Sequence, residues 1–218
     1  MSAPADVVAA ARRWCVPGRR HVLGITGPPG AGKSTLAALV VQALEPAAVI
    51  VAMDGFHLAH AELERLGRAD RKGAPDTFDA AGFVALLKRL RAGGPDTVYA
   101  PAFRREIEEP VAGAVAVAPH VPLVVVEGNY LLGTDGAWAA VRPLLDEVWY
   151  VAPPDELRVE RLVARHVVFG RSPAAAREWV LRSDEANAAV VAATRQRADR
   201  IVTYVDGTTP TLSDVERP

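Results

Sequence analysis

The sequence predicts a single-domain α/β fold over residues 1–218, in three layers (α/β/α), with a mainly parallel five-stranded sheet and a small helical lid. Two observations predict it. Continuous apolar runs alternate with helix-like stretches along the chain, which is the order of a sheet built from strand–helix–strand units. The first apolar run is followed by a glycine-rich turn that opens a helix. With 218 residues, half of them hydrophobic, the chain can bury the core of one such domain.

Five apolar runs predict the strands of this sheet. They are rich in β-branched residues and do not alternate strictly with polar residues, which is typical of strands covered on both faces. Ligands bind at the carboxyl ends of strands in such sheets, so the residues that follow each run are candidates for a functional site. In chain order the runs are His21–Thr26, Ala47–Ala52, Pro122–Glu127, Glu147–Ala152 and the weaker Asp199–Val205.

Helix-like stretches separate these runs. Asp79 is expected to cap the helix that follows it, because an apolar Phe-x-x-Leu-Leu-x-x-Leu stripe begins shortly after it. Residues 97–118 are interpreted as a short hairpin or flap with its tip at Glu106–Pro110, and the polar tail from Gly207 is expected to be loosely held. The predicted helices are Ala5–Trp14, Leu36–Leu44, Asp79–Arg91, Pro154–Phe169 and Pro173–Ala193.

The composition excludes several classes of partner. Lys and Arg total 25 against 26 Asp and Glu, so the chain lacks the net basic charge of a nucleic-acid-binding domain. No run approaches the roughly 18 apolar residues of a membrane helix, and the positive charges near the start follow the apolar part, the wrong order for a secretory signal. Cys15 is the only cysteine, so no internal disulfide can form. We therefore expect a cytoplasmic protein without a membrane or nucleic-acid partner.

The glycine-rich turn is a complete phosphate-binding loop, G-x-x-x-x-G-K-[ST], in the strand–loop–helix context that the motif requires. Its glycines let backbone N–H groups turn towards a phosphate, and the helix N-terminus adds partial positive charge. Lys33 is expected to reach the β- and γ-phosphates, and the Ser34 hydroxyl to bind Mg²⁺. We expect the whole segment to contact ATP: Gly27, Pro28, Pro29, Gly30, Ala31, Gly32, Lys33, Ser34 and Thr35.

Asp54 follows the second predicted strand and is therefore expected at the carboxyl edge, near the γ-phosphate. A carboxylate there can accept the proton of an attacking hydroxyl or hold Mg²⁺ through water. An Asp that caps a turn is the alternative interpretation. His57 can contact the acceptor or serve as a solvated or capping residue.

Glu127 ends the third predicted strand, where phosphate-loop proteins place a second acidic metal anchor. A carboxylate at the end of a buried strand needs a cation or hydrogen-bond donor, because burying its charge unpaired is costly. Mg²⁺ is one candidate partner, and a structural Lys or Arg is the other.

Arg158, Arg161 and Arg165 recur at helical spacing and fall on one face. One interpretation is a solvated basic face. The other is a lid, over residues 158–175, that closes arginines over a polyphosphate and excludes water from the transfer.

Together these motifs resemble those of the phosphoribulokinase/uridine kinase/pantothenate kinase group of phosphate-loop kinases. Met53–His57 is similar to the Met-Asp-Gly-Phe-His of bacterial pantothenate kinases, and Glu127-Gly128 to the Glu-Gly of the group. Arg71–Asp79 and Asn187–Asp199 resemble further segments of the group, and the likeness covers roughly residues 20–203.

The likeness extends to short members of the group that resemble nucleoside/nucleotide or fructose kinases, through Glu127–Leu132, Arg165–Gly170 and Trp179-Val180. It implies Asp54 as the base, with Lys33 and Arg165 as further catalytic residues. It also implies Lys33, Ser34 and Glu127 around MgATP, with Ser34 and Glu127 as the metal ligands. Lid residues implied to contact ATP are Arg161, Arg165 and Arg171. The residues expected to contact the acceptor are Asp54, His57, Phe103, Arg104, Arg105, Glu127, Tyr130 and Asn187.

One departure bears on the acceptor. Uridine kinases read Pro-Val-Tyr-Asp after the hairpin strand, whereas this chain has Pro101-Ala-Phe103-Arg104-Arg105. An arginine in place of the aspartate disfavours uridine and favours an acceptor that carries a phosphate or carboxylate.

The sequence thus predicts an ATP-dependent, Mg²⁺-requiring kinase that acts on the hydroxyl of a nucleoside, sugar or pantothenate-like alcohol. An ATPase and a non-catalytic nucleotide-binding regulator are the alternatives. A GTPase is disfavoured, since the chain has no guanine-reading Asn-Lys-x-Asp segment. A homodimer is expected from the resemblance.

Overall fold

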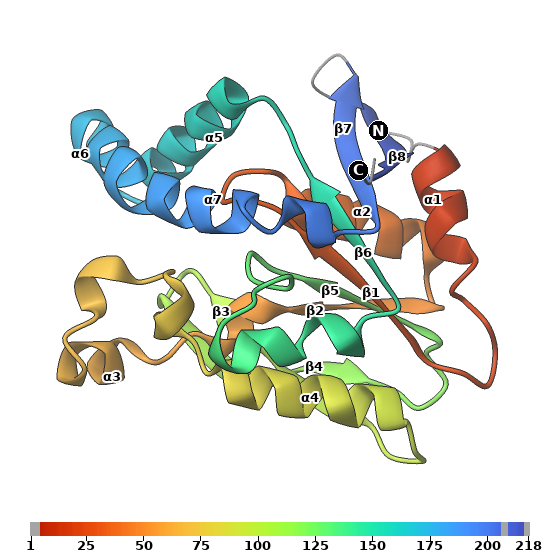
Figure 1. Ribbon diagram of the computed structural model, residues 1–218. Coiled ribbons are helices and arrows are strands. Elements are labelled where there is room, and N and C mark those ends of the chain that lie inside the picture. Colours follow the sequence, from red (N-terminus) through yellow and green to blue (C-terminus); the bar gives the residue numbers. More distant parts are fainter. Residues whose placement is uncertain (1–4, 206–208, 216–218) are drawn as a thin grey trace.

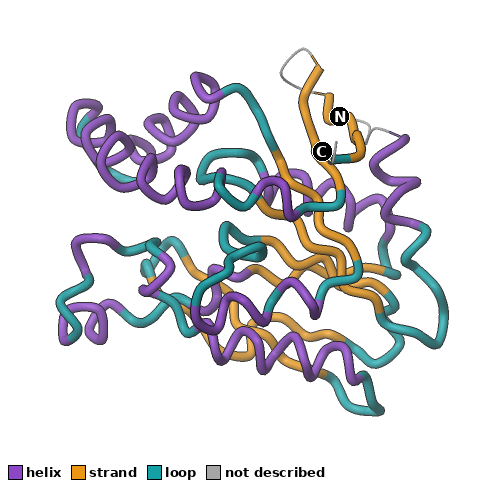
Figure 2. Tube along the Cα trace, in the orientation of Figure 1, coloured by secondary structure: helices purple, strands orange, loops and turns teal. Residues whose placement is uncertain are grey.

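The computed structural model describes residues 5–205 and 209–215, and these form a six-stranded sheet beside a two-stranded hairpin (Figure 1, Figure 2). The order across the sheet is β2-β5-β1-β6-β7-β8; all neighbours are parallel except β8, which runs antiparallel to β7. The sheet strands are β1 (His21–Thr26), β2 (Ala48–Ala52), β5 (Leu123–Glu127), β6 (Glu147–Val151), β7 (Arg200–Val205) and β8 (Thr209–Asp214). The hairpin consists of β3 (Val98–Arg104) and β4 (Glu109–Val117).

Helices cover both faces of the sheet. One apolar cluster packs α1 and α2 against one face, and the other packs α4 and the hairpin against the opposite face. In Figure 1, α5, α6 and α7 lie on one side of the strand ends and the segment with α3 lies on the other. The helices are α1 (Ala5–Arg12), α2 (Lys33–Leu44), α3 (His60–Arg65), α4 (Ala80–Ala92), α5 (Asp155–Val168), α6 (Pro173–Trp179) and α7 (Glu185–Ala192).

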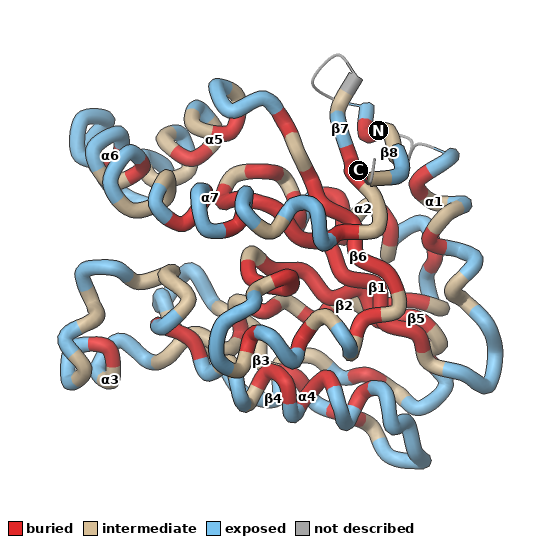
Figure 3. Tube along the Cα trace, viewed as in Figure 1, coloured by how far each residue is buried: buried red, intermediate tan, exposed pale blue. Residues whose placement is uncertain are grey.

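The central strands are buried on both faces, as their apolar runs predict. Every residue of β1, β5 and β6 is buried, and these strands form the red centre of Figure 3. Side chains of successive residues point to opposite faces, so Val124 joins one apolar cluster while Leu123 and Val125 join the other. The strands therefore form a rigid platform whose carboxyl edge carries the loops described below.

Three expectations from the sequence need correction. The sheet has six strands in the described residues, because Thr209–Asp214 pairs with β7 instead of hanging loose. The rest of the predicted polar tail, 207–208 and 216–218, lies outside the described residues. The stretch predicted as one helix from Pro173 is α6, then a π-helical turn over Val180–Asp184, then α7. The first helix ends at Arg12, two residues earlier than predicted.

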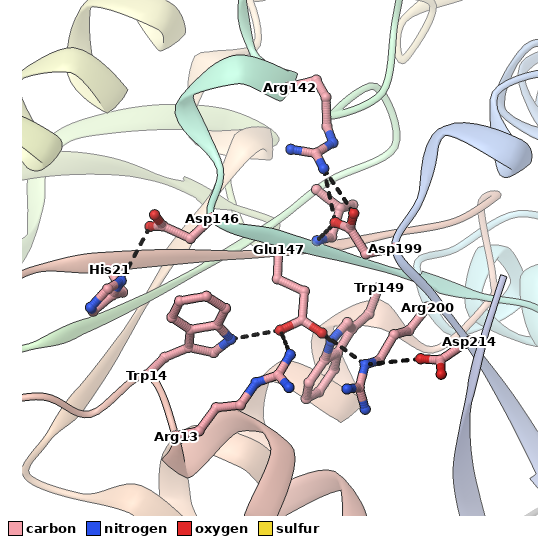
Figure 4. A network of polar contacts seen from close by, with 11 residues as sticks. Arg13, Trp14, His21, Arg142, Asp146, Glu147, Trp149, Asp199, Arg200 and Asp214 are labelled. Carbon is pink, nitrogen blue, oxygen red and sulfur yellow. Dashed lines mark hydrogen bonds and ion pairs between the residues drawn. The ribbon is translucent and has the colours of Figure 1, made fainter.

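At the amino edge of the sheet a polar network joins the turn after α1 to β6 and β7 (Figure 4). Glu147 is 3% exposed and accepts hydrogen bonds from Arg13, from the Trp14 indole at 2.6 Å and from the Trp149 indole at 3.0 Å. Arg200 adds an ion pair at 2.9 Å. Burial raises the pKa of Glu147, but the hydrogen bonds from Arg13 and the indoles outweigh it and leave the pKa below its ordinary value. This network stabilises the edge opposite to the cleft.

Among the helices of residues 5–205 and 209–215, none is both long enough and apolar enough to cross a membrane.

Candidate functional site

A cleft of about 630 Å³ opens at the carboxyl edge of the sheet. Its floor comes from the loops after β1, β2 and β5, its sides from the segment around α3 and the β3–β4 turn, and its far wall from α5, α6 and α7. These are the positions at which parallel sheets bind ligands. The predicted site residues that line the cleft are Pro29, Gly30, Lys33, Ser34, Asp54, His57, Phe103, Arg105, Glu127, Arg165, Arg171 and Asn187.

The phosphate-binding loop leads directly into α2, which begins at Lys33. Gly30 has a φ of +77°, and a Cβ there would lie 2.7 Å from both the Arg158 carbonyl oxygen and Leu162 Cγ. Gly32 precedes the helix with a φ of +92°. Only glycine adopts such angles readily and fits this close contact with α5, so the loop packs tightly against the start of that helix.

Lys33 and Glu127 are two buried groups of opposite charge in the cleft floor. The Lys33 ammonium donates to the Pro28 carbonyl oxygen at 3.0 Å, and its pKa falls to about 8 because burial outweighs the attraction of Glu127 and Asp54. The Ser34 hydroxyl donates to Glu127 Oε1 at 3.2 Å. The pKa of Glu127 rises to about 7 because burial and the nearby Asp54 outweigh Lys33. Burial thus disfavours the charged form of both groups.

Asp54 lies on a single 3₁₀ turn directly after β2, and its side chain is 36% exposed to the cleft. Its Oδ2 lies 4.0 Å from an Arg105 nitrogen, which comes from the hairpin turn. His57 Nδ1 contacts the Asp54 carbonyl oxygen at 2.8 Å, and the imidazole packs against Phe78 and Phe103. Burial lowers the pKa of His57, so its ring is neutral at pH 7. Asp54 is therefore the cleft carboxylate with both exposure and a cation beside it.

The three arginines of α5 have different environments. Arg158 is 2% exposed; it pairs with Glu185 of α7 at 2.6 Å and reaches the Pro29 carbonyl oxygen at 3.4 Å. It thus fixes α5 to the phosphate loop and does not lie on a solvated basic face. Arg161 lies over the Tyr204 ring, on the Gly32 side of the helix, and is not part of the cleft lining.

Arg165 faces the cleft without an ion-pair partner among the described residues. Among the residues that the structure describes, no carboxylate lies within 4.0 Å of its guanidinium. Burial and repulsion by Arg105 lower its pKa. Two mutually repelling cations at one cleft are stabilised when an anion binds between them.

The residues on the floor fit a magnesium ion. Ser34 and Glu127 supply the oxygen ligands that Mg²⁺ prefers, and a cation beside the buried Glu127 would stabilise its charged form against the burial that raises its pKa. Within 5–205 and 209–215, no group of three or more His, Cys, Asp and Glu could hold a metal by itself. This agrees with an ion that is bound by one or two protein groups together with phosphates.

Comparison with known proteins identifies the family. A family model described as "Phosphoribulokinase / Uridine kinase family" matches residues 22–209. The chain belongs to this family. Its relatives include the ATP-dependent kinase-like protein notR' of Aspergillus versicolor, at 40% identity over 62% of this chain and 84% of the relative. YggC of Escherichia coli is 34% identical over 88% of this chain and 81% of its own length.

A solved structure from Silicibacter sp. TM1040, described as a "putative fructose transport system kinase", has a TM-score of 0.81 to this chain and 33% sequence identity, and the match covers 93% of this chain and 100% of the other. The phosphoribulokinase/uridine kinase assignment and the three-layer α/β fold are thus shown independently by sequence and by structure. The family uses ATP with Mg²⁺ to phosphorylate small molecules, and this chain retains the loop and carboxylates described above.

Some predicted site residues lie outside the cleft. Arg104 is exposed on the hairpin and is not part of the lining, whereas its neighbour Arg105 is. Tyr130 is 3% exposed, and its hydroxyl donates to the Gly73 carbonyl oxygen at 2.6 Å beneath the cleft. Of the loop, Gly27, Pro28, Ala31, Gly32 and Thr35 do not line the cleft, although the Pro28 carbonyl oxygen accepts from Lys33.

Other cleft residues were not predicted from the sequence. His166 of α5 contacts Asp184 of the π-helical turn at 2.9 Å, and Trp179 carries the Arg171 guanidinium 4.1 Å above its ring. His166 and Trp179 lie in the segments Arg165–Gly170 and Trp179-Val180, whose resemblance to the family was the only sequence signal that pointed to them. Lys72 lies in another such segment, but nothing in its local sequence indicates that it faces the cleft.

Proposed function

We propose that this protein is an ATP- and Mg²⁺-dependent kinase that transfers the γ-phosphoryl group of ATP to a hydroxyl of a small metabolite. The observation that carries the proposal is the convergence of Lys33, Ser34, Glu127 and Asp54 in one cleft that also contains the unpaired Arg165. A phosphate-binding loop, a metal-fitting pair and an exposed carboxylate are the parts that phosphoryl transfer requires.

In the proposed reaction, Asp54 orients the acceptor hydroxyl and receives its proton. The hydroxyl oxygen bonds to the γ-phosphorus, and the bond between that phosphorus and the β–γ bridging oxygen breaks to release ADP. Lys33 and Arg165 stabilise the negative charge on the transferred group, because charges fixed in a cleft need little reorganisation. Mg²⁺, held by Ser34 and Glu127, would neutralise charge on the β- and γ-phosphates.

The lid and the flap would exclude water from this reaction. Arg105 of the hairpin turn lies 5.9 Å over the ring of Phe169, which is half-exposed at the end of α5. The two segments therefore already contact each other across the cleft. Exclusion of water favours transfer to the acceptor over hydrolysis of ATP.

The test is acceptor-dependent ADP formation. The purified protein is incubated with ATP and Mg²⁺, with and without each compound of a panel of nucleosides, ketoses, sugar phosphates, sugar acids and pantothenate. We expect ADP release to depend on at least one acceptor and a phosphorylated product to appear in equal amount. ADP release without any acceptor would identify an ATPase instead. ATP binding without turnover across the panel would identify a regulator.

We propose a cytoplasmic location, because Cys15 is free and the reaction needs ATP. Cell fractionation tests the location, and sedimentation tests the expected homodimer.

A further inference from the structure

One end of the cleft, away from the phosphate loop, is built from aromatic rings and two polar side chains; we call it the acceptor end. The His57 ring centroid lies 4.0 Å from that of Phe78 and 4.8 Å from that of Phe103. Lys72 and Glu109 complete this part of the lining. Since the His57 ring also contacts the Asp54 backbone, the acceptor end is adjacent to the proposed base.

Lys72 contributes a positive charge that no carboxylate balances. Its ammonium lies 5.2 Å from the Phe103 ring centroid and donates to the Glu108 carbonyl oxygen at 2.6 Å. Across the described ranges 5–205 and 209–215, no Asp or Glu oxygen lies within 4.0 Å of it. An ammonium has three donors, so Lys72 keeps two for a ligand. The contacts with the hairpin hold the charge in the cleft, where it attracts an anion.

Glu109 contributes a hydrogen-bond acceptor that lacks a donor. Its Oε1 accepts from the His60 backbone N–H at 2.9 Å, which fixes the carboxylate. Its Oε2 is buried and has no partner in the described structure. Leaving a buried carboxylate oxygen unpaired is costly, so a Glu109 side chain that turns this oxygen towards a ligand hydroxyl gains the donor that it lacks.

We propose that the acceptor is a small polyhydroxylated molecule that carries a carboxylate or phosphate group. Lys72 binds its anionic group, and Glu109 accepts a hydrogen bond from one of its hydroxyls. The aromatic rings cover the C–H surface of its carbon chain, while another hydroxyl faces Asp54. This assignment rests on the proposed kinase function and narrows its substrate class to sugar acids and sugar phosphates. A neutral nucleoside or free sugar leaves Lys72 without its counter-charge.

The test compares acceptors that differ only in the anionic group. One pair is D-gluconate and D-glucitol, and the other is D-fructose 6-phosphate and D-fructose; the first probes a carboxylate and the second a phosphate. Phosphoryl transfer is measured for each compound at saturating MgATP. We expect the anionic member of at least one pair to have a kcat/KM at least about tenfold above that of its neutral partner. Preference for the neutral member in both pairs would overturn the proposal.

A lysine variant locates the effect. Lys72→Met is expected to raise KM for the preferred anionic acceptor roughly 10- to 100-fold, the range for one hydrogen bond to a charged group, without changing KM for ATP. Lys72→Arg restores part of the affinity. Lys88→Met, which removes an exposed lysine of α4 outside the cleft lining, serves as the matched control and leaves both constants unchanged. Equal effects of Lys72→Met and Lys88→Met would refute the role of Lys72.

Glu109 is tested by its amide. Glu109→Gln is expected to raise KM for both compounds of the preferred pair by a similar factor, because both compounds carry the hydroxyl that Glu109 is proposed to bind. Glu106→Gln, on the exposed turn of the same hairpin, is the control. Should none of the four compounds be phosphorylated, the acceptor assignment fails; the kinase function fails only if no compound of the broader panel is phosphorylated although ATP binds. Transfer to neutral acceptors alone refutes the acceptor assignment and leaves the kinase function standing.

Discussion

Glu127→Gln is predicted to stabilise the metal-free protein and to weaken its stabilisation by MgATP. Glu127 is 7% exposed, and its ordinary pKa of 4.5 rises to about 7 through burial and the nearby Asp54. The folded state therefore holds this proton more tightly than the unfolded chain does. Between pH 4.5 and 7 the folded protein binds more protons, so its stability falls as the pH rises. A glutamine cannot ionise and avoids this loss.

The size of the effect follows from the two pKa values of 4.5 and about 7. At 1.36 kcal/mol per pKa unit, the ionised Glu127 costs about 3 kcal/mol once the pH is well above 7. For a chain of this length, 1 kcal/mol shifts Tm by about 2–4 °C. Glu127→Gln should therefore match the wild type near pH 5 and melt about 6–12 °C higher near pH 8.

The assay is thermal unfolding of both proteins at pH 5 and pH 8, without metal and then with MgATP. The ligand should raise the wild-type Tm and have a much smaller effect on the variant, because the carboxylate proposed to bind Mg²⁺ is gone. A variant that is less stable than the wild type at pH 8, or a difference that does not change with pH, would refute the reasoning.

Glu147→Gln is the matched control, since Glu147 is also buried but has a lowered pKa and a full set of donors. Glu147→Gln is expected to lower the stability by about 1.5–3 kcal/mol at pH 7, because Arg13 and the two indoles lose a charged acceptor while Arg200 keeps Asp214 (Figure 4). Ionised Glu147 stabilises the fold above pH 4.5, and this stabilisation is lost as the pH falls through the lowered pKa. Ionised Glu127 has the opposite effect, because it destabilises the fold as the pH rises. If both variants were more stable than the wild type above pH 7, or both less stable, the environments assigned to the two glutamates would be contradicted.

Two further predictions concern residues near the cleft. Arg158→Met should lower the free energy of unfolding by about 3 kcal/mol, because the Glu185 carboxylate loses its partner. It should also raise KM for ATP more than it lowers kcat, because the Pro29 carbonyl oxygen loses a donor. An unchanged KM for ATP would show that Arg158 does not position the phosphate loop for ATP binding. Tyr130→Phe should cost about 1 kcal/mol through loss of the hydrogen bond to Gly73, with no change in acceptor KM. A large rise in the KM for the acceptor would indicate that Tyr130 contacts the acceptor after all.

The parts of the fold that the sequence predicts well are those whose signals are local. The phosphate loop has a fixed spacing, and β1, β5 and β6 are continuous apolar runs because both of their faces are buried. Lys33, Ser34, Asp54 and Glu127 follow strands or open a helix, so the rule that ligands bind at strand carboxyl ends was enough to bring them together.

The remaining features depend on contacts between distant segments. β8 was missed because Thr209–Asp214 is an edge strand with a largely polar sequence, and its pairing with β7 is its main signal. Arg158 has the spacing of a surface residue, and the approach of α7 through Glu185 and of the phosphate loop through Pro29 buries it. Lys72 and Glu109 meet at the acceptor end because the loop after α3 packs against the hairpin, which no local pattern encodes.

The central claim is that Asp54 accepts the proton of the acceptor hydroxyl, and single-turnover phosphoryl transfer by Asp54→Asn tests it most directly. ATP binding is measured on the same protein, and Asp96→Asn, at an exposed bend, is the control. Loss of the base is expected to slow transfer by roughly 10²–10⁴-fold while the affinity for ATP stays unchanged. Transfer at the wild-type rate would contradict the claim.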